Sequence, residues 1–225
     1  MKGIKHSESI FRYNIKNELI IGVLLVGLLI ILLLINHEYG NIPAYLNRND
    51  VNVFDRWLML PYAEPLDNIV YAFLAVALTL PVILPLAINM KNKGVWLKYV
   101  IMYAQAFLFT FGVRTILKDI INRYRPYMYF EGFLISNDFY NSFPSGSTAL
   151  AFLPATFLSV TFSVEFPNSP WKIPVIIGSY TLAICIGATR IFSGTHFLTD
   201  VLAGAVIGIF FGWVIPALHK KTNNI

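Results

Sequence analysis

The sequence has few charged residues and almost no cysteine, and each shortage excludes a class of protein. Charged residues are 13% of the 225 residues, hydrophobic residues are 56%, and the mean hydropathy is +0.63. Soluble domains carry about 25% charged residues, so this composition predicts a membrane protein. The single cysteine, Cys185, lies inside an apolar run, which excludes a disulfide framework and a Cys-x-x-Cys metal or redox motif.

The basic residues also lack the continuous run or solvated face that would indicate nucleic-acid binding. The net charge is +5 and the isoelectric point is about 9.3. However, the lysines and arginines form short clusters between apolar stretches, as membrane topology requires. We therefore expect no nucleic-acid partner, and the bilayer is the expected environment.

Six apolar stretches are each about long enough to cross a bilayer as a helix. They are Leu19–Ile35, Ile69–Asn89, Val95–Leu117, Ser147–Val164, Ile173–Ala188 and Phe197–Leu218. A cleaved signal peptide is the competing interpretation of the first stretch, but the run is long for one and no small-residue cleavage pattern follows it. The sequence thus predicts an all-α membrane protein with a six-helix bundle, without internal repeats or low-complexity segments.

The expected organisation is a single membrane domain, 19–218, between cytoplasmic segments 1–18 and 219–225. Placing both termini inside assigns ten of the 17 Lys and Arg residues to the cytoplasm, as the positive-inside rule favours. The connections 36–68 and 119–145 then lie outside. The second is about 27 residues long, which is unusual for a compact bundle and suggests a functional loop. The predicted localisation is the cell (inner) membrane, with an outward-facing site.

The segment Thr189–Asp200 places polar and ionisable groups between two very apolar runs. If the residues after Ser193 are helical, His196 and Asp200 lie one turn apart on the same face. The carboxylate can then hold one ring nitrogen and leave the other to react. The competing interpretation is a packed histidine and a carboxylate that reaches the interface.

Two other segments belong to the same predicted outer face as Thr189–Asp200. They are Lys118–Pro126 and Pro144–Ser147. Together the three supply three cations, Lys118, Arg125 and Arg190, whose clustering is costly unless an anion is bound. Ser145 and Ser193 are candidate caps for helices whose N-termini would also face that anion. The pattern predicts a phosphate site with a histidine nucleophile.

These three segments resemble the three motifs of the type-2 phosphatidic acid phosphatase superfamily, also called lipid phosphate phosphatases. The family motifs are Lys, six residues, Arg-Pro; then Pro-Ser-Gly-His; then Ser-Arg, five residues, His, three residues, Asp. Their spacings match this sequence in order over residues 118–200, and the six-span layout covers nearly the whole chain.

The resemblance implies an active site in which His196 attacks phosphorus to form a phosphohistidine and Asp200 orients its imidazole. It implies that the phosphoryl oxygens are bound by Lys118, Arg125, Arg190, the Ser145 hydroxyl and backbone N–H groups near Gly146. Water then hydrolyses the intermediate. No metal or other cofactor is expected, and the substrate is a membrane lipid phosphate or diphosphate.

Two positions depart from the family motifs. Thr189 replaces a serine and keeps the hydroxyl, whereas Ser147 replaces the histidine that, in the family, protonates the leaving group. General acid catalysis is worth about 10²–10⁴-fold in rate, and a serine hydroxyl cannot supply it at neutral pH.

Three hypotheses account for Ser147. In the first, the leaving group is a stable anion, as in a lipid diphosphate or sugar 1-phosphate. In the second, another group donates the proton, and the candidates are His37, Glu64, Asp138 or a water held by Ser147 and Thr148. In the third, the chain binds lipid headgroups without turnover.

Further alternatives remain open at this point. Arg114 extends the phosphate site or instead pairs with Asp119 or reaches the interface. A lipid phosphotransferase would use the same intermediate as a phosphatase, and a transporter fits less well because the charges lie at span ends. No motif in the sequence identifies the lipid headgroup.

Overall fold

The computed structural model describes residues 10–35, 46–87, 93–131 and 139–221, and most of them are helical. The elements are α1 (Ile15–Leu34), η1 (Arg48–Asp50), α2 (Val53–Trp57), α3 (Glu64–Ala87), α4 (Lys93–Ile121), η2 (Pro126–Tyr129), α5 (Gly146–Glu165), α6 (Lys172–Phe192) and α7 (Leu198–His219). Six of these helices, all except α2 and the 3₁₀ turns, are long and apolar enough to cross a membrane. The predicted all-α, six-span fold is confirmed.

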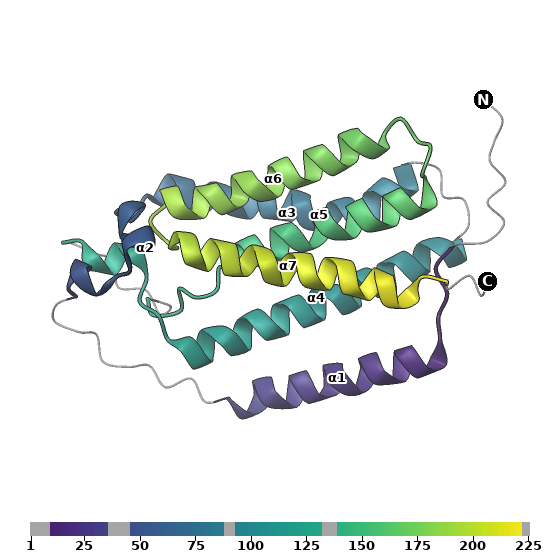
Figure 1. The fold of residues 1–225 in the computed structure, drawn as a ribbon, viewed down its shortest axis with the longest axis horizontal. Helices are drawn as coiled ribbons and strands as arrows, with labels where there is room; N and C mark the ends of the chain where they lie inside the picture. Colours follow the sequence, from purple (N-terminus) through teal and green to yellow (C-terminus); the bar gives the residue numbers. More distant parts are fainter. Residues whose placement is uncertain (1–9, 36–45, 88–92, 132–138, 222–225) are drawn as a thin grey trace.

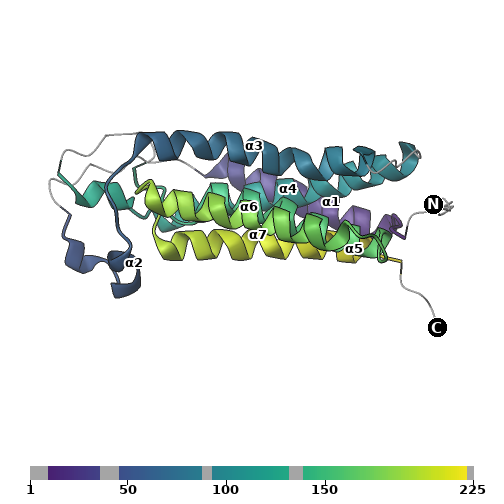
Figure 2. The same ribbon diagram turned by 90° about the horizontal axis from the view of Figure 1, so that it is seen from above.

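The six long helices lie side by side with roughly parallel axes (Figure 1). The short helix α2, the α6–α7 turn and the chain that enters α5 lie together at one end, whereas the first and last described residues lie at the other (Figure 2). We call the first end the site end, which comprises residues 46–67, 118–131, 139–147 and 189–200. The other is the terminal end, which comprises residues 10–18, 93–105, 161–172 and 215–221.

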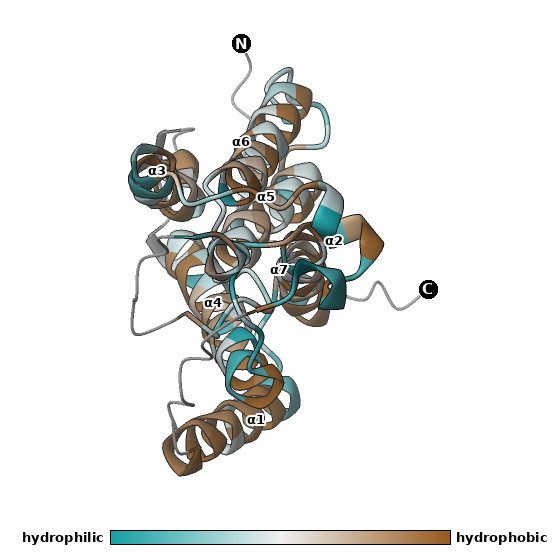
Figure 3. Cartoon of the chain, turned by 90° about the vertical axis from the view of Figure 1, so that its left-hand side faces the viewer, coloured by the Kyte–Doolittle hydropathy of each residue, from teal (hydrophilic) through white to brown (hydrophobic). Residues whose placement is uncertain are grey.

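Helix α5 forms the centre of the bundle and α1 lies at its edge. In the apolar window of α5, 67% of the residues are buried, against 6% in α1. The ribbon of α1 is hydrophobic around nearly its whole circumference (Figure 3). A helix that is apolar on every side and exposed to its surroundings suits contact with lipid tails.

A stripe of three glycines on α7 lets that helix approach α5 at backbone distance. Gly204, Gly208 and Gly212 are spaced by four residues, so they share one face of the helix. A methyl group on Gly204 or Gly208 would collide with the carbonyl oxygens of Ser145 or Ala149 in α5 and its cap. Small residues at such a contact are the usual means of close helix packing in membranes.

The helices extend beyond the apolar stretches that predicted them. Helix α3 starts at Glu64 instead of Ile69, α4 continues to Ile121, and α6 continues to Phe192. Hydropathy marks only the apolar part of a helix, and polar residues continue the helix at its ends. Acidic residues in the first turn of α3 are favourable there, because they face the positive end of the helix dipole.

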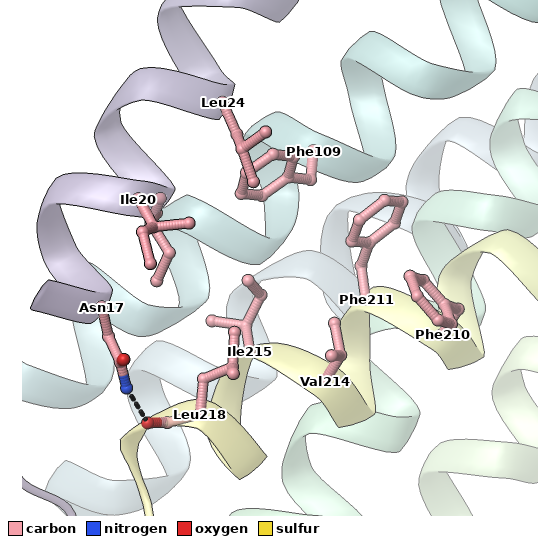
Figure 4. Close-up of a pocket in the computed structure, with 10 residues that line it drawn as sticks. Asn17, Ile20, Leu24, Phe109, Phe210, Phe211, Val214, Ile215 and Leu218 are labelled. Atoms are coloured by element: carbon pink, nitrogen blue, oxygen red, sulfur yellow. Dashed lines mark hydrogen bonds between the residues drawn. The ribbon is translucent and has the colours of Figure 1, made fainter.

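At the terminal end, the two ends of the chain are joined. Phe11 and Lys220 form an antiparallel bridge, and the Arg12 N–H donates to the His219 carbonyl over 2.7 Å. Residues 15–18, expected in the cytoplasmic segment, belong to α1. A cavity of about 230 Å³ lies nearby between α1, α4 and α7, lined by apolar side chains and Asn17 (Figure 4). None of the predicted site residues lines it.

Candidate active site

His196 lies in a tight turn between α6 and α7. Helix α6 ends at Phe192, and Gly194 then takes a positive φ of 69°, which stops the helix. The hydroxyls of Ser193 and Thr195 donate to the Arg190 carbonyl, at 3.1 and 3.0 Å. These bonds fix the turn that holds His196. The expected helix from Ser193 onward is therefore wrong, because the glycine turn intervenes.

The ring orientation of His196 is set by a backbone carbonyl. Its Nδ1 lies 2.8 Å from the Ser142 oxygen, and the residue is 2% exposed. A carbonyl only accepts, so Nδ1 carries the hydrogen and Nε2 carries the lone pair in the neutral ring. Burial lowers the pKa of His196 well below its ordinary value, and the fields of Arg125, Arg190 and Lys118 lower it further. The ring is thus held in its neutral form.

Asp200 lies in the first helical turn of α7 and accepts hydrogen bonds from residues beside His196. Its Oδ2 accepts the Phe197 N–H at 2.8 Å and the Ser142 hydroxyl at 2.5 Å, whereas the His196 Nδ1 is 3.7 Å away. The Asp200 carbonyl also accepts the Ser145 N–H at 2.9 Å. The carboxylate therefore caps α7 and fixes Ser142, whose carbonyl in turn holds His196.

Two residues that sequence reasoning did not select complete this arrangement. Arg123 joins two carboxylates, with 2.6 Å from Nη1 to Asp200 Oδ1 and 2.6 Å from Nη2 to Asp55 Oδ2. Asp55 comes from α2, is fully buried, and accepts the Thr199 N–H at 2.9 Å. Burial alone would raise the pKa of Asp55, but hydrogen bonds from Arg123, Thr199 and Asn52 outweigh it, so the pKa is lowered.

The three predicted cations are anchored around this turn. Lys118 Nζ donates to the Asn141 carbonyl at 2.6 Å, and Arg125 Nη1 donates to the Thr195 carbonyl at 3.2 Å. Arg190, in the last turn of α6, is 4% exposed and pairs with Asp67. The helix continues past Ala188, where the predicted span ended, and so includes Arg190. All three lie close enough to His196 to lower its pKa.

Asp67 is a further site residue that the sequence did not indicate. It lies in the first turn of α3, where its Oδ2 accepts the Tyr62 hydroxyl at 3.0 Å. The same bond, together with burial, raises the pKa of Tyr62 to about 12, with burial the larger cause. The segment before α3 also covers the His196 turn, because the Ala63 N–H donates to the Ser193 carbonyl at 3.1 Å.

The second motif starts α5, as expected, but its capping differs. Ser145 occupies the N-cap position without a capping bond from its side chain, and its Oγ lies 2.8 Å from Thr148 Oγ1. Ser193 does not cap α7 either: it follows α6, and Phe197 is the N-cap residue of α7. Ser147 is half-buried in the first turn of α5.

Among the candidate substitute acids, Glu64 is the one that the structure describes. Glu64 is exposed at the start of α3, and His37 and Asp138 lie outside the described residues. Arg114 does reach the second motif, because a methyl group on Gly146 would come within 2.7 Å of its Nη1. Among the described residues, no group of three or more His, Cys, Asp or Glu side chains is arranged to hold a metal ion.

The fold and the site together define a six-helix membrane protein with a buried, neutral histidine among three cations. Residues 95–224 match the PAP2 superfamily, more than half of the chain, and the chain belongs to that family.

Three similarities illustrate this membership. The chain is 40% identical over 89 residues to the lipid A 1-phosphatase of Porphyromonas gingivalis, covering 37% of this chain but 18% of that protein. It is 30% identical to the bacitracin transport permease protein BcrC of Bacillus licheniformis, covering 79% and 82% of the two chains. The crystal structure of Aquifex aeolicus LpxE superposes with a TM-score of 0.50 and 28% identity, covering 71% of this chain and 90% of that one.

Proposed function

We propose that this protein removes a phosphate group from a membrane lipid phosphate or diphosphate through a phosphohistidine on His196. The observation that carries the proposal is the Ser142 carbonyl bond at Nδ1, which leaves the lone pair on Nε2. The anchored cations Lys118, Arg125 and Arg190 support it, because they suit the equatorial oxygens of a phosphoryl group.

In the first step, Nε2 forms a bond to phosphorus and the bond from phosphorus to the lipid oxygen breaks, with its electron pair remaining on that oxygen. The Nδ1 hydrogen stays on the ring, bonded to Ser142. The positive charge that develops on the ring is stabilised by the carbonyl and by nearby Asp200. In the second step, water attacks phosphorus, the N–P bond breaks, and both protons of the water leave with inorganic phosphate.

The roles of the other residues follow from their contacts. Asp200, Arg123 and Asp55 keep the His196 turn fixed, whereas Asp67 and Tyr62 hold Arg190. We also propose that the chain lies in the cell membrane with its termini inside and the site end outside. The distribution of basic residues supports this orientation, since ten of the 17 Lys and Arg lie in segments then assigned to the cytoplasm.

The test is phosphate release from detergent micelles that contain a lipid phosphate or diphosphate, with EDTA present. We expect the wild type to release phosphate and His196→Ala to release none above background, although both show the same thermal unfolding. Equal release by the two proteins from every substrate would overturn the proposal. Loss of wild-type activity in EDTA, restored by a divalent metal, would overturn the metal-independent mechanism.

A labelled-phosphate experiment separates hydrolysis from transfer. Rapid acid-free quenching of the wild type with terminally labelled substrate should trap label on the protein, and His196→Ala should carry none. For a phosphatase, the label then appears as inorganic phosphate whether or not an acceptor lipid is added. Release that requires the acceptor would identify a phosphotransferase instead.

A further inference from the structure

Arg114 is a half-buried cation beside the start of α5, and the proposed mechanism does not use it. It lies on α4, one helical turn before Lys118, so both side chains are on the same face. Its guanidinium lies against Gly146, the first residue of α5, where an added methyl group would be 2.7 Å from Nη1 and 3.2 Å from Cζ. The residue after Gly146 is Ser147, where the family motif has its general acid.

The Arg114 Nε atom is buried and has no hydrogen-bond partner among the residues that the structure describes. The guanidinium also lies over the Phe111 ring, 4.3 Å from its centroid. A cation–π contact engages the face of the guanidinium, so it gives no acceptor to the Nε N–H, which lies in the guanidinium plane. A buried donor without an acceptor is costly, and an anionic ligand oxygen would remove that cost.

A series of contacts joins the start of α5, beside Arg114, to His196. Ser145, which precedes Gly146, donates its N–H to the Asp200 carbonyl at 2.9 Å. Asp200 holds Ser142, and Ser142 holds His196. Arg114 therefore lies beside the helix start that these contacts join to the His196 turn, around which Lys118, Arg125 and Arg190 are anchored.

We propose that Arg114, beside the start of α5, forms a second phosphate subsite, and that the substrate is a lipid diphosphate. This inference rests on the proposed function. His196 attacks the terminal phosphorus, held by Lys118, Arg125 and Arg190. The bond to the bridging oxygen breaks, and its electron pair stays on the lipid monophosphate. Arg114 binds the phosphate that remains on the lipid and stabilises the new charge.

The chemistry of the leaving group explains why Ser147 suffices at the histidine position. A lipid alcohol is a very weak acid, as water is, so its oxygen must receive a proton as it leaves. A phosphate monoester has a second pKa of about 6, and it leaves as an anion that needs a cation, not an acid. Arg114 supplies that cation.

The experiment compares a prenyl monophosphate with the diphosphate of the same chain length, in the same detergent with EDTA. The proteins are wild type, Arg114→Gln, Arg114→Lys, Ser147→His and Arg56→Ala. Arg56 is the matched control because it is an exposed arginine of α2 that donates to Asn49. Thermal unfolding of each variant accompanies the kinetics.

We expect the wild type to prefer the diphosphate, and Arg114→Gln to lower kcat/KM for the diphosphate by about 10²–10³-fold. Its effect on the monophosphate should stay within about threefold, Arg114→Lys should restore part of the loss, and Arg56→Ala should change neither substrate. Ser147→His should raise turnover of the monophosphate far more than that of the diphosphate.

Two results would overturn the inference while the proposed function stands. One is an equal loss on both substrates in Arg114→Gln, which would make Arg114 part of a general phosphate site. The other is no loss on either. If Arg114→Gln unfolds, Arg114→Lys and Ser147→His are used instead, and the change in kcat/KM is compared between the two substrates. An equal change on both substrates, or no change on either, would overturn the inference. A wild type that is no more active than His196→Ala would instead remove the proposed function.

Discussion

The two ends of the bundle each contain a buried histidine, and the two histidines are held differently. His196, at the site end, bonds a carbonyl through Nδ1 at 2.8 Å and lies among three cations. His219, at the terminal end, bonds the Ile215 carbonyl through Nδ1 at 2.8 Å and Glu18 through Nε2 at 2.7 Å. Within the described part of the chain, His196 is hydrogen-bonded through Nδ1, whereas His219 uses both ring nitrogens to hold the fold.

The residues around the two histidines also differ between the two ends of the bundle. At the terminal end, Glu18 also accepts from Gln105 at 2.9 Å, and Phe11 packs edge-on against Tyr99. These contacts tie together both ends of the chain and α4. At the site end, the ionisable groups lie on turns and helix ends, held by carbonyls and carboxylates. Burial alone therefore does not distinguish the two histidines, and the partner of the second ring nitrogen does.

The strongest test of this comparison replaces each histidine in turn and measures both phosphate release and stability. His196→Ala should lower phosphate release by at least about 10³-fold, because it removes the nucleophile, and it should leave the unfolding temperature nearly unchanged. His219→Ala should do the reverse, with activity at low temperature within about threefold of wild type and an earlier unfolding transition. Activity loss in both, with equal stability, would erase the distinction.

Phe11 offers the next largest effect, confined to stability. It is 1% exposed and lies in the core cluster with Met102 and Leu153. Phe11→Ala should destabilise the fold by about 3–5 kcal/mol, since it leaves a cavity. Thermal or denaturant unfolding in detergent measures this, and phosphate release by the remaining folded protein should match wild type. A normal unfolding curve would show that the chain ends do not support the bundle.

Asp55 should affect turnover more than substrate binding. Asp55→Asn weakens its bonds to Arg123 and Thr199, so the His196 turn loses part of its support. We expect kcat to fall by about 10–100-fold, the usual loss when a supporting partner of a site ligand is removed, with KM little changed. Asp50→Asn, an exposed residue of η1, is the control. A change in KM alone would indicate that Asp55 acts on the substrate path instead.

The smallest effect concerns pH. A histidine with a pKa of 6.5 would be about three quarters protonated at pH 6, and activity would fall accordingly. The lowered pKa of His196 keeps it neutral there, so kcat should change by less than about twofold between pH 7.5 and pH 6. The same shift has a stability consequence: because the folded pKa lies below the unfolded one, its contribution is full above about pH 6.5 and declines as the pH falls towards the folded pKa.

A kinetic profile of kcat against pH, measured with thermal unfolding over the same range, checks both statements. Arg190→Lys keeps a cation near His196 and serves as a comparison for the field effect. A descending limb centred near pH 6.5 in the wild type would contradict the lowered pKa.

Sequence reasoning located the spans because an apolar run of bilayer length leaves few alternatives. It also selected Lys118, Arg125, Arg190, His196 and Asp200 as the site residues, through motif spacing. The structure brings these residues around one turn. Their catalytic roles remain part of the proposal.

The supporting residues had no comparable signal. Asp55 and Asp67 lie 145 and 133 residues before Asp200 in the chain, and nothing local marks either as a partner of an arginine. Ser142 contributes a carbonyl, which any residue type would provide. The His196 turn was missed because the i, i+4 spacing of His196 and Asp200 also fits a helix, and only Gly194 indicates otherwise.

The glycine stripe of α7 sets a condition for anyone who would transplant this site to another scaffold. Gly204 and Gly208 fix the spacing between α5 and α7, and that spacing brings the Ser145 N–H onto the Asp200 carbonyl. If the three motifs were copied onto helices that lie further apart, the sequence spacing of the site residues would be kept. Their side chains would nevertheless not come together as they do here. The minimal portable unit is therefore the motifs together with the glycines, which lie outside all three motifs.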